Sequence, residues 1–451
     1  GAVMSALYAR SVQAERRALA AEALAREEER SARVVARYMV DVFRLAAPTR
    51  RRPDEVTARQ VLDAGYAKVG DELADQPLIQ GRLLTAMGQA YQGLGLMPEA
   101  REAYLRALDV RRELWDGPHP ELSESLNLVG LALRHAGDLV TAETLYAEAL
   151  AIDTALSDGP TADLGRDRAM LGSLLVDLGR LDEAEALQRE ALETYRQLPD
   201  DRIAGSRDSV ICMVTANLGS TLRKRGKLDD AAVALEEAVA RGRRVFGDRH
   251  PEVATFLNNL AGVRKDMGQY ARAEALYREV VDLRREHGGE DHPNHARALN
   301  NLASLMQASG RSTAADSLYR DVVSRFRAHY GRRHPYVSFP LLGRGRALID
   351  LDRPEQASPL VAEAVAIRRE AFPAGNWRTL EAESLLGSCF AAQGDTAVAE
   401  SLLVGAYEGL RAALGDESRF TREARERLAT FRETSDRAAM AAGSPVRPAP
   451  R

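Results

Sequence analysis

The sequence predicts an all-α protein, a solenoid of repeated helix pairs that one long helix precedes. Three observations lead to this prediction. A turn residue recurs every 42 residues, an alanine follows it at a fixed distance, and His-Pro dipeptides recur with the same period. The composition agrees, because helix-forming residues dominate the chain and aromatic residues make up only 5% of it. We expect almost no β-strand.

The turn residue is a glycine in seven of the eight repeats and an aspartate in the seventh repeat of the array. One step of 47 residues, which contains an insertion near residues 198–206, interrupts the period of 42. Glycine tolerates the left-handed backbone that ends a helix, and a small alanine lets two helices approach closely. The turn residues are Gly95, Gly137, Gly179, Gly226, Gly268, Gly310, Asp352 and Gly394. The alanines five residues later are Ala100, Ala142, Ala184, Ala231, Ala273, Ala315, Ala357 and Ala399.

The His-Pro dipeptides mark the loop between one helix pair and the next. In the segment Gly247-x-x-His250-Pro251, we expect the glycine to end a helix and the proline to occupy the first position of the next helix. The unit is therefore a helix, a short turn, a second helix and a loop. The dipeptides lie at 119–120, 250–251, 292–293 and 334–335, with a degenerate copy at 376–377.

The repeat resembles a known family. The run Leu257-Asn-Asn-Leu-Ala261, followed by Gly268, Ala273-Glu-Ala-Leu-Tyr277 and His292-Pro293, is similar to the 42-residue tetratricopeptide repeats of kinesin light chains and their bacterial relatives. The resemblance covers eight repeats over residues 77–415. It implies a right-handed superhelix in which the first helix of each pair lines a concave groove.

The N-terminal part has no clear repeat. We expect a long charged helix over residues 1–52 and a helical adaptor or degenerate repeat over 53–76, with its helix from Pro53 to Leu73. With the start of the first repeat, these segments resemble the region after the membrane span of bacterial membrane-anchored Ser/Thr protein kinases. That resemblance implies a kinase domain upstream. Gly1 to Tyr8 is either the end of a membrane span or an ordinary helix start, so the chain is either cytoplasmic or extracytoplasmic.

The C-terminal part is expected to close the array. Residues 416–434 read as a capping helix with many charged residues. Residues 435–451 contain Pro, Gly and Ser without helical periodicity, which predicts a disordered tail.

The composition and motifs argue against several functions. The formal net charge of -4 gives no reason to expect a nucleic-acid partner, and no segment is long and apolar enough to insert into a membrane. Cys212 and Cys389 lie too many repeats apart for a disulfide and are expected to be buried. No catalytic, cofactor or metal-binding pattern appears, and His287, His292 and His295 are interpreted as structural. We therefore expect no enzyme activity and no cofactor in this chain.

The candidate binding residues occupy equivalent positions before the turn on the first helices. The family resemblance implies that an asparagine nine positions before the turn faces the groove and binds the ligand backbone; its amide offers both donors and an acceptor. The alternative is that these asparagines cap or bridge neighbouring helices. Small residues and basic residues lie six and three positions before the turn. The candidates are Asn217, Asn259 and Asn301, then Ser220, Gly262 and Ser304, and then Arg134, Arg223 and Lys265.

The sequence favours an interaction module that binds a protein or peptide in the groove, as the regulatory or sensor region of a bacterial receptor-type kinase. Arg223 and Lys265 favour an acidic ligand, although aspartates lie beside them two positions before the turn. The alternative is a stand-alone scaffold or adaptor, or a repeat region attached to another effector. The sequence upstream of Gly1 would discriminate between these alternatives.

Overall fold

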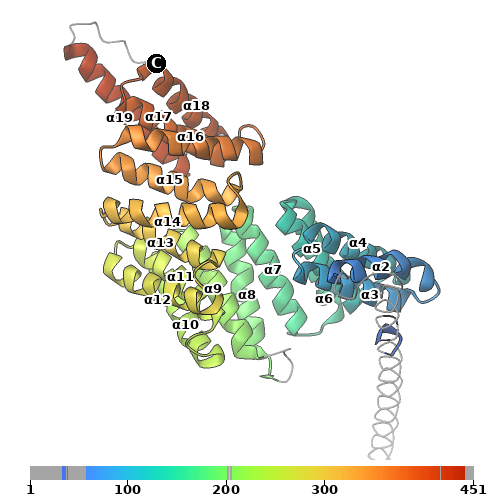
Figure 1. The fold of residues 1–451 in the computed structure, drawn as a ribbon. Helices are drawn as coiled ribbons and strands as arrows, with labels where there is room; N and C mark the ends of the chain where they lie inside the picture. Colours follow the sequence, from blue (N-terminus) through green and yellow to red (C-terminus); the bar gives the residue numbers. More distant parts are fainter. Residues whose placement is uncertain are drawn as a thin grey trace, which may run out of the picture. The chain divides into compact units, whose positions relative to one another are not determined.

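A computed structural model describes residues 33–36, 38, 57–200, 203, 206–416 and 418–441, and every regular element within them is an α-helix (Figure 1). The expected all-α fold is therefore confirmed. The described helices are α2 (Ala58–Glu72), α3 (Pro77–Gly93), α4 (Met97–Leu114), α5 (Pro120–Ala136), α6 (Leu139–Leu156), α7 (Ala162–Asp177), α8 (Leu181–Gln197), α9 (Arg207–Lys224), α10 (Leu228–Phe246), α11 (Pro251–Asp266), α12 (Tyr270–Gly288), α13 (Pro293–Ala308), α14 (Ser312–Tyr330), α15 (Pro335–Asp350), α16 (Pro354–Ala371), α17 (Trp377–Ala392), α18 (Thr396–Leu414) and α19 (Arg419–Ala441).

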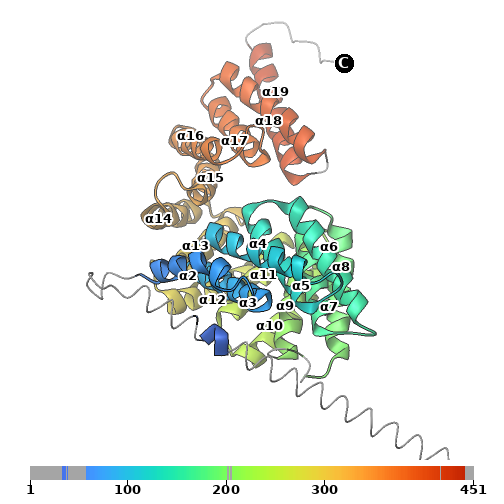
Figure 2. The same ribbon diagram turned by 90° about the vertical axis from the view of Figure 1, so that its right-hand side faces the viewer.

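Helices α3 to α8, over residues 77–197, and helices α11 to α18, over residues 251–414, form consecutive antiparallel pairs, as the ribbon views show (Figures 1 and 2). Within a pair, the two helices are joined by a turn of two or three residues. Each pair packs mainly on the pair before it and the pair after it, which is how a solenoid extends its core along one axis. Within the described part of the chain, no helix has the length and apolar character of a membrane span.

The turn residues adopt the predicted conformation. All seven turn glycines have positive φ angles, for example 88° at Gly137 and 73° at Gly268. Asp352 has φ of 57° and is the single described residue other than glycine with a positive φ. The eight alanines that follow are each 0% exposed, so their role as close-contact residues is confirmed as well. Any larger side chain at these positions would push the two helices of a pair apart.

Each His-Pro loop starts a first helix with a histidine cap. The imidazole Nδ1 of His119, His250, His292 or His334 accepts a hydrogen bond from the backbone N–H two residues later, at 3.1–3.2 Å. Proline follows at the first helical position, as expected. In the degenerate copy, the Oδ1 atom of Asn376 accepts the equivalent bond from the N–H of Arg378 at 3.0 Å. The histidine therefore satisfies one of the free N–H groups at the start of the helix.

The chain divides into two compact units, Gly1–Thr221 and Leu222–Arg451. The core of the first unit contains Leu83, Tyr91 and Leu126, and the core of the second contains Leu341, Val361 and Leu385. Cys212 and Cys389 are both buried, as the sequence predicted.

Two predicted boundaries differ from the structure. The helix expected from Pro53 begins at Ala58, because Thr57 caps it in a reciprocal arrangement with Gln60. Helix α19 continues to Ala441, past the expected end at residue 434. The segment Arg437-Ala-Ala-Met-Ala441 lacks an apolar stripe, but its alanines have high intrinsic helix propensity. Most of the long helix expected over residues 1–52, and residues 442–451 of the expected tail, lie outside the described residues.

Candidate functional site

The candidate residues lie on four first helices. Arg134 is on α5, Asn217 and Ser220 are on the part of α9 that belongs to the first unit, and the others belong to the second unit. There, α11 and α13 contact each other directly. Their shared surface holds Asn259, Lys265, Asn301 and Ser304, which are all half-buried, and we call these four residues the amide face.

Arg223 forms an ion pair with the next first helix in the array. Its Nε atom lies 2.5 Å from Oδ2 of Asp266, and both side chains are partly exposed. The guanidinium passes directly over Gly262, where a Cβ atom would come within 2.9 Å of the Arg223 Cζ. Gly262 is therefore small because Arg223 crosses above it. The sequence predicted that the small residue at position 262 leaves space for a ligand, but the Arg223 side chain occupies that space.

The same link recurs at two other places in the array. Nε of Arg134 lies 2.6 Å from Oδ2 of Asp177, and Nε2 of Gln307 donates to Oδ2 of Asp350 at 3.1 Å. In each case the residue three positions before one turn meets the aspartate two positions before the next turn. Arg134 and Arg223 are thus neutralised within the chain and serve to join repeats. A spacing of 43 residues between a basic residue and an aspartate was the signal in the sequence.

Lys265 differs from Arg134 and Arg223, because it forms no ion pair with a carboxylate among the described residues. Its Nζ atom is 3.2 Å from Oγ of Ser304 on α13. Burial lowers the pKa of Lys265; nearby Asp266 raises it, and Arg223 lowers it further. The side chain therefore holds a positive charge in a partly desolvated position, where a ligand oxygen would interact with it more strongly than in water.

The three asparagines differ in whether they bridge helices or have an amide that could bind a ligand. Asn301 bridges helices, since its Nδ2 atom donates to Oδ1 of Asn258 at 2.8 Å. Asn259 makes no hydrogen bond to other described residues, although it is half-buried. Asn217 is exposed, while Ser220 donates to the carbonyl of Ala216 at 3.0 Å within its own helix. The free amide that the groove interpretation requires is present most clearly at Asn259.

The sequence reasoning missed an aromatic group near the start of α15. Tyr336 and Phe339 are each 43% exposed, with ring centroids 6.4 Å apart. The Arg368 guanidinium lies 5.3 Å from the Phe339 ring. Phe339 stands thirteen positions before its turn, and the exposed Arg297 has the same position on α13. Aligning the repeats at this position would have identified both residues as surface groups on the side of the first helices.

The histidines do not form a metal centre. His292 caps α13, while Nδ1 of His287 lies 2.9 Å from the Leu283 carbonyl oxygen and Nδ1 of His295 lies 2.9 Å from that of Glu290. Among the described residues, no group of three or more His, Cys, Asp or Glu side chains is arranged to hold a metal ion.

Family models for the tetratricopeptide repeat match residues 80–155, 168–198 and 211–328. The chain therefore carries tetratricopeptide repeats, and the resemblance drawn from the repeat sequence is confirmed to that extent. No curated protein matches the sequence.

A solved structure that aligns over most of this chain shows the same fold. A signal transduction ATPase with a tetratricopeptide repeat sensor from Pyrococcus horikoshii aligns with a TM-score of 0.56 at 14% identity, over 89% of this chain and 55% of that protein. BtubC (BKLC) from P. vanneervenii aligns at 24% identity and a TM-score of 0.41, over 47% of this chain and 82% of that one. A kinesin-light-chain-type protein with nearly identical repeats from Podosopora anserina aligns at 22% identity and a TM-score of 0.39, over 45% and 96%.

Proposed function

We propose that this chain of tetratricopeptide repeats binds an extended segment of a partner protein across the amide face of α11 and α13. The repeats themselves make the chain a scaffold for protein–protein interaction. The observation that carries the narrower proposal is Asn259, a half-buried amide without a hydrogen-bond partner among the described residues. Such an amide can pair with both the N–H and the C=O of a ligand backbone.

The neighbours of Asn259 support this role. Asn301 is held in place by Asn258, and Ser304 is held by Lys265, so these polar groups are ordered before a ligand arrives. Ordered groups lose little conformational entropy on binding, which favours affinity. The exposed rings of Tyr336 and Phe339, on the first helix that follows, offer apolar contact area for the side chains of a ligand.

The expectation of an acidic ligand rests on fewer residues than the sequence indicated. Arg134 and Arg223 already pair with Asp177 and Asp266, so Lys265 is the remaining basic group of the original set. We propose that a ligand carboxylate, where one is present, lies beside Lys265.

Membership of a larger signalling protein is a separate proposal. The resemblance of residues 1–130 to the region after the membrane span of bacterial Ser/Thr kinases supports a sensor or regulatory role. A stand-alone scaffold or a repeat region of another effector is the alternative. Reading the gene upstream of Gly1 tests this directly: a kinase domain followed by a membrane span supports the first role, and a start codon adjoining Gly1 excludes it.

The amide face can be tested with a peptide selected from a random 12-residue library displayed on phage. We expect the double substitution Asn259→Ala and Asn301→Ala to weaken binding of the selected peptide by roughly 1–3 kcal/mol, because partner groups lose their hydrogen bonds. The melting temperature should fall only modestly, since the substitutions remove one part-buried hydrogen bond, between Asn301 and Asn258, and leave the apolar core intact. Isothermal titration and thermal melts provide the two measurements.

A matched control is Glu279→Ala, which removes an ion pair with Arg243 on second helices, away from the amide face. This control should bind the peptide as the native chain does. The amide-face proposal fails if the double variant binds the peptide with the affinity of the native chain.

A further inference from the structure

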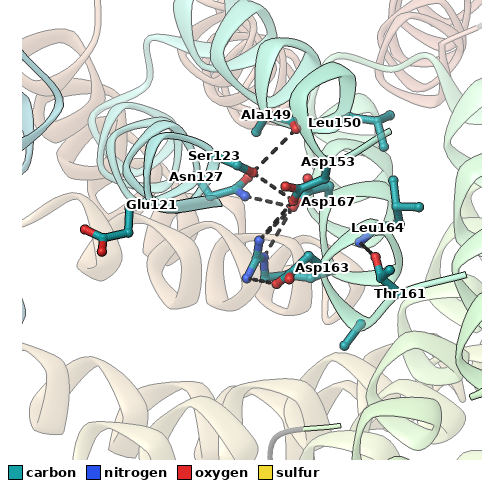
Figure 3. A network of polar contacts seen from close by, with 12 residues as sticks. Glu121, Ser123, Asn127, Ala149, Leu150, Asp153, Thr161, Asp163, Leu164 and Asp167 are labelled. Carbon is teal, nitrogen blue, oxygen red and sulfur yellow. Dashed lines mark hydrogen bonds and ion pairs between the residues drawn. The ribbon is translucent and has the colours of Figure 1, made fainter. Parts of the chain in front are cut away.

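A cluster of polar residues is buried inside the first unit, where α5, α6 and α7 meet (Figure 3). Asp153 of α6 and Asp167 of α7 lie at its centre and are within hydrogen-bond reach of each other. Their exposed fractions are 5% and 0%. Two carboxyl groups are rarely placed together away from water, because two adjacent negative charges repel each other there.

The neighbouring side chains hold both carboxyl groups in fixed positions. The Asp153 Oδ2 atom accepts a hydrogen bond from Oγ of Ser123 at 2.8 Å, and the Asp167 Oδ1 atom accepts one from Nδ2 of Asn127 at 2.7 Å. Arg166 donates to Asp167 at 3.2 Å and to Asp153 at 3.5 Å. These bonds tie the three helices to one another through side chains alone.

The charges in the cluster do not balance. Arg166 is the one cation in it, and it also pairs with the more exposed Asp163 at 2.7 Å. The remaining groups that face the pair are uncharged, namely Ser123 and Asn127 from α5 and the Tyr195 phenol from α8. If both buried aspartates were ionised, the single positive charge of the guanidinium would have to balance three negative charges, those of the two buried aspartates and of Asp163.

Two buried acceptor atoms lack donors, which also points to a missing hydrogen. Neither Oδ2 of Asp167 nor Oδ1 of Asn127 has a hydrogen-bond partner. An unsatisfied buried acceptor costs about 1–3 kcal/mol, so such atoms are uncommon. A proton on Asp167 would turn one of these acceptors into a donor.

The repeat register shows that the acidic residue at Asp153 is exceptional. Asp153 lies sixteen positions after its turn glycine, where the second helix faces the next first helix. The equivalent residues in the other repeats are basic, aromatic, aliphatic or glycine. They are Arg111, Tyr195, Gly242, Arg284, Phe326, Arg368 and Leu410. This junction alone therefore places a second carboxyl group against a buried aspartate.

We propose that Asp153 and Asp167 share one proton and that the loss of this proton loosens the junction between α6 and α7. The junction would then act as a pH-sensitive joint within the first unit, independent of ligand binding on the amide face. Below the transition the shared proton joins the carboxyl groups. Above it, the proton leaves to solvent and the two carboxylates repel each other.

The electrostatic surroundings place the transition near neutral pH. Burial and the hydrogen bond with Asp153 together raise the pKa of Asp167 to about 7, against the opposing effect of the Arg166 charge. A carboxyl group whose pKa is raised in the folded state binds its proton more tightly when folded. Its contribution to stability is therefore fully present below the unfolded pKa near 4 and is lost as pH rises toward 7.

The joint can be tested by hydrogen exchange of the full chain between pH 5 and pH 8. We expect the protection factors of α6 and α7 amides to fall with rising pH, by up to about tenfold per pH unit between pH 5 and 7. Asp167→Asn mimics the protonated carboxyl and should flatten this dependence. Asp163→Asn removes a carboxylate from the same arginine at an exposed position and should leave the dependence in place.

A direct readout is the carbon-13 shift of the aspartate carboxyl groups in the native chain. We expect one aspartate to titrate well above pH 5 and its signal to be absent in the Asp167→Asn variant. The proposal is overturned if every aspartate titrates below pH 5, or if Asp167→Asn and the native chain show the same pH dependence of protection. Because the carbon-13 measurement needs no substitution, it stands even where a variant folds poorly.

Discussion

Two buried arginines show how single side chains join neighbouring repeats. Arg111 and Arg368 are each 2% exposed, and each lies sixteen positions after its turn. Nη1 of Arg368 lies 2.8 Å from Oε2 of Glu381 on the following first helix, and its Nε atom donates to Oγ of Ser338 at 3.1 Å. Burial raises the pKa of Glu381, but Arg346 and Arg368 outweigh this effect and leave it below its usual value. Glu381 is therefore the anion that makes a buried arginine tolerable.

We predict that Glu381→Ala destabilises the second unit by about 3–5 kcal/mol, because the substitution leaves the Arg368 charge buried without its partner. Urea denaturation followed by circular dichroism measures this change. The control is Glu370→Ala, which breaks the exposed pair with Arg333 and should cost about 0–1 kcal/mol. Equal effects of the two substitutions would mean that the buried pair has no special role.

The starts of four first helices, α5, α11, α13 and α15, depend on a neutral imidazole ring. In three loops the capping histidine stacks on an aromatic residue four positions earlier. The centroid distances are 3.6 Å for Trp115–His119, 4.8 Å for Phe246–His250 and 4.6 Å for Tyr330–His334. The aromatic residue lies at the end of the preceding second helix, so the stack connects one helix pair to the next. The cap requires a lone pair on Nδ1, which a protonated ring lacks.

We predict that His334→Ala costs about 0.5–2 kcal/mol at pH 7.5, as the loss of an N-cap does elsewhere. His334→Asn should retain most of the stability, because Asn376 caps α17 in this way. Thermal melts of the three proteins measure the difference. If His334→Ala were as stable as His334→Asn or more stable, the cap would be unimportant.

The same histidine should make α15 sensitive to acid. Burial lowers the pKa of His334, and His329 lowers it further. A base whose pKa is lowered in the folded state stabilises the fold above its unfolded pKa near 6.5 and ceases to do so as pH falls. We therefore predict that lowering the pH from 7.5 to 5 reduces the melting temperature of the native chain more than that of His334→Asn. A pH-independent difference would contradict this.

On the scale of the whole molecule, the contacts are local along the chain. Within each unit, the helices pack mainly on their immediate neighbours in sequence. In such an array, stability is close to a sum of the stabilities of the repeats and of the interfaces between adjacent repeats. A change in one repeat should therefore act on the repeats beside it and fade with distance.

We predict that Leu341→Ala, which empties part of the core under α15, lowers local stability by about 2–5 kcal/mol. Hydrogen exchange should show the largest loss of protection in α14 to α17 and a smaller loss in α11 and α12 of the same unit. A uniform loss across all of these helices would indicate one cooperative fold in place of a nearest-neighbour array.

The sequence by itself determined the local features of this protein. The period, the glycine turns, the close-contact alanines and the proline starts all follow from backbone geometry within a few residues. Each of these features could be assigned from Gly268, Ala273 or Pro293 without knowledge of any distant contact. The all-α fold follows from these features together with the helix-forming composition.

The tertiary structure alone decided which polar groups meet. Arg223 pairs with Asp266, Asn301 with Asn258, and Asp153 with Asp167, and each pair joins different helices. Whether a basic residue is free for a ligand or neutralised by the next repeat depends on how adjacent helices are stacked and rotated. Burial, which sets the pKa of Asp167, likewise arises only after packing removes water from the site. The sequence therefore placed the candidate residues on the first helices of their repeats, but it could not give their partners, because those partners belong to other repeats.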